Sequence, residues 1–514
     1  MSPRTPPLAA IAAAMLLCSC AVLNWSGGVT EKPPLREDGS WPVDTPENHG
    51  MRSGKLAELI DFIRARGIPV HSLMVVRNGF KIVDANFYPY DGKSPHNVAS
   101  VTKSVMTTLI GIAVDRGELR LSDPLLSYFP GWEEGRGDPR KGAITIEQVA
   151  SMTSGLACDL DPDESTLREM MNSSDYVKFS LGRPVQWNPG SRFVYDSPAM
   201  HLLSPVLQCA TGQAVREYAL AYLFGPLGIS DFIWERDPQG YYKGWAELSL
   251  YTNDMAKLGY LFLRKGAWGR ERLVSEDWVA RATAPRPAAR PKDADPYGYG
   301  WWIDPAVKHG FRAAGRGGQY IFVLPEWDMV IAATGGGFEM DEIAPRLLAC
   351  FNASSASLAP DPSGAESLEL ALERAVEGPD SITPAALPAI AARVDGKRYH
   401  FDVNQSGLRS IEIRFSTPEA GQILWSMDDD VGPAIAVPVG FDGAFRMFPG
   451  LDGKPRAFRG HWMDDESFML EYDGITNNDH GFLALRFSGN TVDVEVRETA
   501  HARVVRFTGS RVAP

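Results

Sequence analysis

The chain has 514 residues, of which 44% are hydrophobic and 22% are charged, proportions that are ordinary for a soluble globular protein. Its length favours two or three domains. The net charge of −13 argues against nucleic acid or an anionic membrane surface as the main partner, because phosphate groups are bound by basic surfaces.

The N-terminus is typical of a bacterial export signal. One basic residue, Arg4, precedes an apolar run from Leu8 to Leu17, which is too short to span a membrane. The run ends in the sequence LCSC, which resembles a lipoprotein cleavage box with Cys20 as the lipidated residue. Cleavage near Ala21, which would release a free periplasmic protein, is the alternative. We expect export to the periplasmic side of a bacterial membrane, with membrane contact only through a lipid on Cys20.

Strands and helices follow in an order that fits one α/β domain. The segment from His71 to Tyr88 predicts two strands that turn at Asn78-Gly79, because this dipeptide favours a tight hairpin turn. A helix is expected from Ser100 to Gly117, and several helices come after it. One of them opens at Thr145 with the spacing of a capping box.

Two more strands are predicted in "GGQYIFVLPEWDMVIAATGGG", with a turn at Pro325 to Asp328. Strands at both ends of this region, with helices between them, fit a sheet that is built from both ends and packed against helices. From residue 352 the composition predicts a linker with one helix. Beyond Ile390, short runs such as "SIEIRFST" and "TVDVEVRE" predict a separate antiparallel β domain.

The helix from Ser100 contains the first candidate for chemistry. Its apolar residues cover most of the circumference, which is typical of a buried helix, yet Ser100 and Lys103 share one face of its first turn. Burial lowers the pKa of a lysine, so a desolvated Lys103 could accept the hydroxyl proton of Ser100 and make it a nucleophile. The alternative is that the S-x-x-K spacing arises by chance and that Lys103 reaches solvent.

Two other motifs follow in a set order: Tyr195-x-Ser197, and Arg316-Gly317-Gly318 at the start of a strand. Together with S-x-x-K they resemble the pattern of the penicillin-recognising serine hydrolases. "VASVTKS", "LSDPLLSYFP", "FVYDSPAMHLLSPVL", "LFGPLGI" and "TNDMAKLGYLFLRKG" extend the resemblance to the class C β-lactamase-related family of esterases, amidases and peptidases. It covers roughly residues 51 to 350.

The resemblance implies a fold and a domain order. In the part that the resemblance covers, the fold would be α/β, more strictly α+β: a β-lactamase/transpeptidase-like antiparallel sheet flanked by helices, with a helical subdomain. The C-terminal antiparallel β domain lies outside the resemblance and is predicted from its own strand pattern. The expected segments, in order, are a signal peptide, a leader, the β-lactamase-related domain, a linker with one helix and the β domain: 1–20, 21–50, 51–351, 352–389 and 390–514. Because the β domain carries none of the three motifs, we expect it to be dispensable for chemistry.

The resemblance also implies roles for single residues. Ser100 would form an acyl-enzyme, Lys103 would take its proton, and Tyr195 would shuttle a proton to the leaving group and later activate water. The oxyanion hole would be formed by the backbone N–H groups of Ser100 and Gln319. The expected substrate-binding residues are Ser197, Arg316, Gly317, Gly318 and Gln319. No metal and no organic cofactor are implied.

Two departures from the family pattern bear on the substrate. The second motif is Tyr-Asp-Ser, whereas β-lactamases of this class have Tyr-Ala-Asn or Tyr-Ser-Asn. The third has Arg316 in place of lysine or histidine, and glycine in place of threonine. Both favour an esterase or amidase that acts on a small molecule or short peptide over a true β-lactamase. A catalytically idle scaffold, or a protein that binds cell-wall peptide, is the alternative.

Competing chemistries are not supported. The chain contains no G-x-S-x-G, the motif of an α/β-hydrolase, and none of its nine histidines lies in H-E-x-x-H, the motif of a zinc peptidase. Three cysteines lie beyond the N-terminal region, and we expect one disulfide, Cys158–Cys209, and a free Cys350. Asp254 is expected to cap a helix. Four aromatic residues are expected to pack in the core and at its rim: Tyr297, Tyr299, Trp301 and Trp302.

Overall fold

The structure is a computed structural model that describes residues 35, 39–132, 138–159, 164–292, 294–304, 307–351, 356–380, 382–383, 387–427, 434–450, 453–500 and 503–511. The predicted signal peptide, with Cys20, and most of the predicted leader lie outside these residues. In the part of the chain that is described, no helix combines the length and the apolar character needed to cross a membrane.

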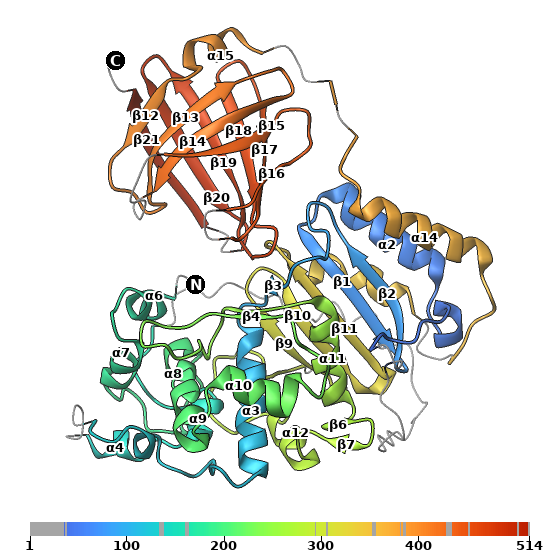
Figure 1. The fold of residues 1–514 in the computed structure, drawn as a ribbon, viewed down its shortest axis with the longest axis vertical. Coiled ribbons are helices and arrows are strands. Elements are labelled where there is room, and N and C mark those ends of the chain that lie inside the picture. Colours follow the sequence, from blue (N-terminus) through green and yellow to red (C-terminus); the bar gives the residue numbers. More distant parts are fainter. Residues whose placement is uncertain are drawn as a thin grey trace.

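The N-terminal domain, residues 39–376, is built on a six-stranded antiparallel sheet in the order β2-β1-β11-β10-β9-β8 (Figure 1). As the sequence predicts, both ends of the domain contribute to the sheet. The strands, in the order of the sheet, are Phe80–Asn86, Val70–Arg77, Met329–Gly335, Gln319–Leu324, Phe311–Gly315 and Trp302–Ile303.

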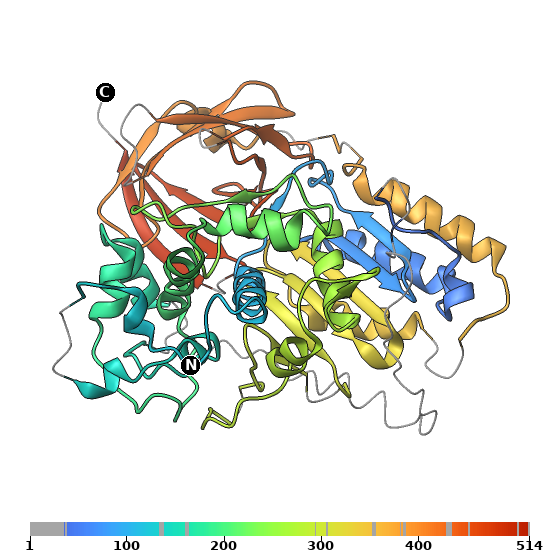
Figure 2. The ribbon, with the colours of Figure 1, turned by 60° about the horizontal axis from the view of Figure 1, so that its bottom comes forward.

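Helices cover both faces of this sheet. On one face lie α2 (Ser53–Arg66), α13 (Ala344–Ala349) and α14 (Pro362–Val376); on the other lie α3 (Val101–Asp115) and α11 (Thr252–Leu263) (Figures 1 and 2). Alternate side chains of β1 enter the two hydrophobic cores, because successive residues of a strand point to opposite faces. The helix predicted for the linker is α14, and it packs along α2 as part of this domain.

A helical subdomain is inserted between β2 and the later strands. Its helices are, in chain order, α4 (Pro139–Gly142), α5 (Ile146–Ala150), α6 (Ser165–Met171), α7 (Tyr176–Gly182), α8 (Ser197–His201), α9 (Leu203–Thr211) and α10 (Val215–Ala219). The capping box predicted at Thr145 is present at the start of α5, with Gln148 as its partner. Helix α12 (Glu276–Ala282) and the short strands β3 (His96–Asn97), β4 (Ile233–Trp234), β5 (Leu248–Leu250), β6 (Ala267–Trp268) and β7 (Glu271–Arg272) complete the domain.

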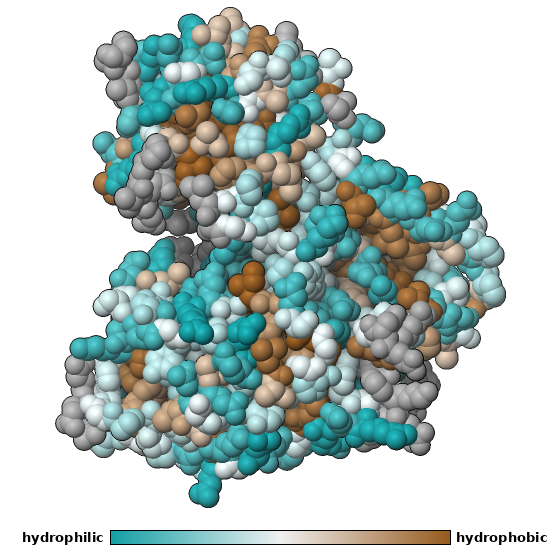
Figure 3. Space-filling view, viewed as in Figure 1, coloured by the Kyte–Doolittle hydropathy of each residue, from teal (hydrophilic) through white to brown (hydrophobic). Residues whose placement is uncertain are grey.

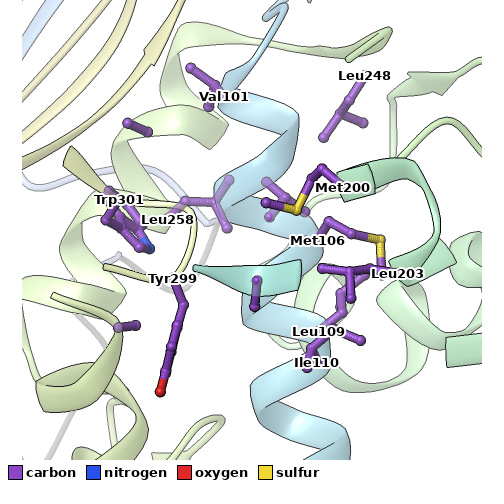
Figure 4. Close-up of a cluster of buried hydrophobic side chains, with 14 of the residues drawn as sticks. Val101, Met106, Leu109, Ile110, Met200, Leu203, Leu248, Leu258, Tyr299 and Trp301 are labelled. Carbon is purple, nitrogen blue, oxygen red and sulfur yellow. The ribbon is translucent and has the colours of Figure 1, made fainter. Parts of the chain in front are cut away.

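Helix α3 runs through the middle of the domain. Thirteen of its fifteen residues are buried, which agrees with the predicted apolar circumference. Met106, Leu109 and Ile110 pack against the subdomain side chains Met200 and Leu203, as Figure 4 shows. The middle of α3 is therefore packed against the helical subdomain, while other residues of the helix contact β9 and β10 of the sheet.

The C-terminal domain, residues 389–511, starts with α15 (Ala389–Val394) and continues as a ten-stranded sheet. An extra pairing between β15 and β17 closes this sheet into a barrel-like shape with its own core. The strands β12 to β21 are Arg398–Phe401, Leu408–Phe415, Ala420–Met427, Ile435–Gly440, Arg446–Phe448, Arg456–Trp462, Ser467–Asp473, His480–Ser488, Thr491–Glu498 and Arg503–Arg511.

The two domains meet through the turn between β18 and β19, residues 474–479. Within it, the carbonyl of Thr476 accepts a hydrogen bond from the backbone N–H of Asn97 at 2.9 Å. Beside this turn, Asp473 forms a buried ion pair with His71 of β1 at 3.2 Å. Figures 1 and 2 show this end of the C-terminal domain next to β3. In Figure 3 the surface is hollowed between the C-terminal domain and the helical subdomain below it.

Candidate active site

Ser100 lies at the N-terminus of α3, directly after a turn that its neighbours fix. Ala99 has a φ of 46°, an uncommon value for a residue with a Cβ atom. The Asn97 side chain accepts a hydrogen bond from the backbone N–H of Ala99 at 2.8 Å, and the Thr102 hydroxyl donates to the Ala99 carbonyl at 2.6 Å. These bonds hold the strained turn and present Ser100 at the surface of a cavity.

The side chain of Lys103 forms a hydrogen bond with the side chain of Ser100. Its Nζ lies 2.7 Å from Ser100 Oγ and donates a second hydrogen bond to the carbonyl of Trp245 at 3.0 Å. The Lys103 side chain is only 1% exposed. Burial lowers its pKa to about 7, and the Arg316 charge acts in the same direction, whereas Glu164 and Asp196 oppose the shift. Near neutral pH a large fraction of Lys103 is therefore uncharged and able to accept a proton.

Tyr195 lies against the same pair. Lys103 Nζ is 4.8 Å from the centre of the Tyr195 ring, which stacks on Trp302 at 5.6 Å and meets Tyr297 edge-on at 6.3 Å. Burial raises the pKa of Tyr195, and its hydrogen bond with Ser100 acts against that rise. The structure thus brings Ser100, Lys103 and Tyr195 together, as the motifs predict.

The middle residue of the second motif has a structural role. Asp196 is buried, accepts a hydrogen bond from the backbone N–H of Ala199 as the N-cap of α8, and pairs with Arg183 at 2.9 Å. Asp196 thereby fixes the turn that carries Tyr195 on one side and Ser197 on the other. Ser197 faces the cavity and donates a hydrogen bond to Glu164 Oε1 at 3.4 Å.

Glu164 is a site residue that the sequence analysis missed. It precedes α6, has a φ of 49°, and places its carboxylate 3.7 Å from the guanidinium of Arg316. Both side chains line the cavity beside Ser100. No motif marks Glu164, because its place beside Arg316 arises from a contact between residues more than 150 positions apart in the chain. The predicted site residue Arg316 is therefore paired with an anion before any substrate binds.

The strand end that carries the third motif approaches Ser100 closely. A Cβ atom on Gly315 would lie 3.0 Å from the backbone nitrogen of Ser100, so only glycine fits there. Gln319 pairs with Gly315 across the turn. The Gln319 side chain is buried and donates to the carbonyl of Gly335 at 2.7 Å. Only its main chain therefore remains available for the predicted contact with substrate.

Gly317 and Gly318 form the turn between β9 and β10, with φ values of 83° and 97°. A Cβ atom would lie 2.5 Å from Asn478 at Gly317 and 2.3 Å from Phe338 at Gly318. Among the described residues that line the cavity, neither glycine is included. Both glycines are closely packed, and their contact with substrate stays a prediction.

The C-terminal domain lines the same cavity as Ser100, although the sequence predicts that this domain is dispensable for chemistry. Asn478 occupies the space next to Gly317 and donates a hydrogen bond from Nδ2 to the carbonyl of Arg316 at 3.1 Å. The cavity has a volume of about 750 Å³ and extends from Ser100 along this turn into the C-terminal domain. Within the described ranges, no group of three or more His, Cys, Asp or Glu side chains is arranged to hold a metal ion.

The predicted disulfide and the predicted cap at Asp254 are wrong, whereas the predicted packing of the four aromatic residues is confirmed. Cys158 and Cys209 are free thiols, so the expected disulfide is absent from the described residues; Cys350 is free, as expected. Asp254 does not cap α11 but forms a buried ion pair with Lys257 at 2.9 Å. The four aromatic residues do pack as expected, and one of them, Trp302, also supports the ring of Tyr195.

Comparisons with known proteins agree with this geometry. Residues 56–346 match the model of the family described as Beta-lactamase. "Protein flp" of Staphylococcus aureus (strain MW2) is 25% identical over 202 residues, which cover 38% of this chain and 38% of that protein. A "Putative D-alanyl-D-alanine carboxypeptidase" of Salmonella paratyphi B (strain ATCC BAA-1250 / SPB7) is 22% identical over 335 residues, 51% of this chain and 76% of that protein.

The fold is shared with a solved structure. The "Putative 6-aminohexanoate-dimer hydrolase from Bacillus anthracis" superposes with a TM-score of 0.51 at 17% identity, covering 62% of this chain and 88% of that one. At this identity the likeness concerns the fold alone. It confirms the predicted arrangement of an antiparallel sheet between helices with a helical subdomain.

Proposed function

The chain belongs to the β-lactamase family of serine hydrolases, and on this premise we propose that it hydrolyses an ester or amide through an acyl-enzyme on Ser100. The observation that carries the proposal is the contact between Lys103 Nζ and Ser100 Oγ at 2.7 Å, made by a lysine whose pKa is lowered to about 7. A buried, partly uncharged amine at hydrogen-bond distance is what a serine hydroxyl needs to become a nucleophile.

The proposed reaction has two halves. In the first, Ser100 Oγ attacks the substrate carbonyl carbon while its proton passes to Lys103 Nζ, and the carbonyl oxygen becomes an oxyanion. The bond from carbon to the leaving oxygen or nitrogen then breaks, and the leaving group takes a proton through Tyr195. In the second, a water molecule gives a proton to Tyr195 or Lys103 and attacks the acyl-enzyme; the acid leaves and Ser100 Oγ regains its proton.

The oxyanion is stabilised in this proposal by the backbone N–H groups of Ser100 and Gln319. The approach of Gly315 to the Ser100 nitrogen supports it, since it brings the start of β10 next to the first turn of α3. Ser100 also lies at the N-terminus of a fifteen-residue helix, where the aligned peptide dipoles favour a developing negative charge.

Esterase or amidase activity is favoured over hydrolysis of β-lactams. Ser197 offers a hydroxyl that is already bonded to Glu164, where a β-lactamase of the related class has a free amide. The third motif has Gly317 at the position of the threonine, so the hydroxyl group is missing, and Asn478 packs on this glycine. The printed names of two of the similar proteins, "Putative D-alanyl-D-alanine carboxypeptidase" and "Putative 6-aminohexanoate-dimer hydrolase", agree with an amide or ester substrate.

Hydrolysis of a substrate panel tests the proposal. The panel holds p-nitrophenyl esters, nitrocefin, D-alanyl peptides and short amide oligomers, each with wild type and with Ser100→Ala. We expect turnover of esters or amides, reduced by several orders of magnitude in the variant. No turnover of any substrate by folded wild type would favour the alternative of an idle scaffold or peptide-binding protein.

We further propose that the chain is exported and lipidated on Cys20, supported by the apolar run from Leu8 to Leu17 and the LCSC sequence. Expression in a Gram-negative host followed by fractionation tests this, with Cys20→Ala as the matched variant. Wild type is expected in the membrane fraction and the variant in the soluble periplasmic fraction. The same distribution for both proteins would remove the lipid anchor from the proposal.

A further inference from the structure

The cavity that contains Ser100 continues into the closed sheet of the C-terminal domain. Its total volume of about 750 Å³ lies within the range of about 300–1,000 Å³ that is usual for small-molecule sites. On the side of the N-terminal domain its wall is mixed: the polar side chains of Ser100, Glu164, Ser197 and Arg316 lie beside apolar ones such as Leu167, Met171 and Trp245. Inside the C-terminal domain the larger part of the wall is apolar, with Trp425, Ile435, Val437, Phe458, Leu483 and Val496, and the polar side chains there include Arg456, His480 and Glu498.

These apolar side chains lie on the inner face of the closed sheet. Trp425 of β14 and Ile435 of β15 are directly opposite each other in the register, and Val437 follows two residues later on the same face. Ala436, between them, is exposed on the outer face. Phe458, Leu483 and Val496 are buried on three further strands. The cavity therefore enters the interior of this domain and is not a groove on its surface.

The interior is closed at the end far from Ser100. The far ends of β13 and β17 carry Phe415 and Trp462, whose rings stack at 5.8 Å, and Phe468 at the start of β18 packs on both, at 6.4 Å and 5.4 Å. The near ends of the same strands carry the cavity residues Leu408 and Phe458. The result is a pocket with an apolar, filled base and an opening at the turn that carries Asn478.

We propose that the interior of the C-terminal domain is a subsite for a long apolar acyl chain of the substrate, whose carbonyl carbon reacts at Ser100. This inference rests on the proposed function, since it takes Ser100 as the reacting group. An apolar wall offers few hydrogen bonds to water, so an apolar chain displaces water from it readily. Each methylene group buried there increases the binding constant by up to about fourfold. The part of the cavity beside Ser100 then holds the ester or amide and its leaving group.

A series of p-nitrophenyl esters with acyl chains from acetate to dodecanoate tests the subsite in the full-length protein. We expect kcat/KM to rise by at least tenfold from acetate to octanoate and then to level off as the interior is filled. A kcat/KM that falls steadily with chain length, while acetate is hydrolysed well, would overturn the subsite and leave the proposed function intact.

Two neighbouring substitutions separate the inner face from the outer face of the same strand. Val437→Trp fills the interior and is expected to lower the ratio of kcat/KM for dodecanoate over acetate by tenfold or more. Ala436→Trp adds the same side chain on the outer face and is expected to leave the ratio as in wild type. If Val437→Trp does not fold, Ile435→Arg replaces it as the inner-face variant, because Ile435 is only half-buried; the same fall in the ratio is expected. Equal ratios in wild type and in a folded inner-face variant would contradict the proposal.

A binding measurement distinguishes failure of the subsite from failure of the catalytic proposal. In Ser100→Ala, a dansyl-labelled fatty acid is expected to bind with saturation, to be displaced by dodecanoate, and to bind at least tenfold more weakly when Val437→Trp is added. If no ester is hydrolysed by wild type but this binding is found, the catalytic proposal fails and the subsite stands. If esters are hydrolysed and no saturable binding is found, the subsite is refuted.

Discussion

Asn478 of the C-terminal domain donates a hydrogen bond from Nδ2 to the main-chain carbonyl of Arg316, 3.1 Å away, in the turn that opens β10. The same side chain fills the space beside Gly317, where a Cβ atom would lie 2.5 Å from it. The turn that carries a predicted substrate-binding cation is thus held by a residue more than 150 positions later in the chain. The C-terminal domain is in this way part of the candidate site.

Asn478→Ala should therefore impair catalysis. Loss of the hydrogen bond from Nδ2 loosens the turn that positions Arg316 and Gln319, whereas the Cβ atom that packs on Gly317 is kept in alanine. We expect kcat/KM for a p-nitrophenyl ester to fall about tenfold, equivalent to roughly 1.4 kcal/mol. The exposed turn residue Asn490, at the far end of β19, provides the control variant Asn490→Ala. Equal kcat/KM values for wild type and Asn478→Ala would show that the turn holds its shape without the C-terminal domain.

Lys103 should determine the pH dependence of the reaction. Burial lowers the pKa of Lys103 to about 7, and only the uncharged amine accepts the proton of Ser100. We expect kcat/KM to rise as the pH is raised through about 7 and to level off above it. Lys103→Arg should be nearly as inactive as Lys103→Ala, because a guanidinium stays protonated near neutral pH. Substantial activity in Lys103→Arg would mean that the residue acts only as a positive charge.

Arg316 and Glu164 should shift that pH profile in opposite directions. The Arg316 charge lowers the pKa of Lys103 and the Glu164 charge raises it. Arg316→Ala should therefore move the rising limb of kcat/KM to higher pH, and Glu164→Gln should move it to lower pH. Both variants should keep the fold and should still react with a fluorophosphonate at Ser100. Shifts in the same direction, or none in either variant, would indicate that neither charge acts on Lys103.

The buried cluster at the domain boundary should make stability depend on pH. His71 Nδ1 lies 2.8 Å from His96 Nε2, and burial, reinforced by the His71 charge, lowers the pKa of His96 from 6.5 to about 3. The unfolded chain therefore binds a proton at His96 that the folded chain does not, so stability is lost as the pH falls below about 6.5. Between pH about 6.5 and about 5 the loss should reach roughly 2 kcal/mol.

The urea midpoint, measured by tryptophan fluorescence across this pH range, checks the effect of His96. His96→Asn removes one titrating group and should reduce the slope of the pH dependence, even if it lowers stability overall; burial also lowers the pKa of His201, so part of the slope should remain. A variant with the same slope as wild type would assign the pH dependence to other groups.

Local motifs and their order along the chain were enough to predict that Ser100, Lys103 and Tyr195 lie together. Ser100 and Lys103 share a helix turn, and Tyr195 lies in a short motif whose order along the chain is typical of the family. The strands of the C-terminal domain were also predicted, because alternation of polar and apolar residues is a local property. The buried aromatic residues followed from the same alternation.

Contacts between distant segments could not be predicted in this way. Glu164 has no motif, and it meets Arg316 through a contact between residues more than 150 positions apart in the chain. Nothing in the sequence "GITNNDHG" around Asn478 indicates that this turn enters another domain. The helix α14 was assigned to a linker because its composition is polar, yet its narrow apolar stripe packs on α2.

The central claim is that Ser100 is a nucleophile activated by Lys103, and covalent labelling tests it most directly. The full-length protein is treated with a fluorophosphonate at several pH values, and the adduct is counted by intact mass and located by peptide mapping. One adduct on Ser100 is predicted, forming faster as the pH rises through about 7, and absent from Ser100→Ala. Folded wild type that forms no adduct, or that is labelled on a different residue, would contradict the claim.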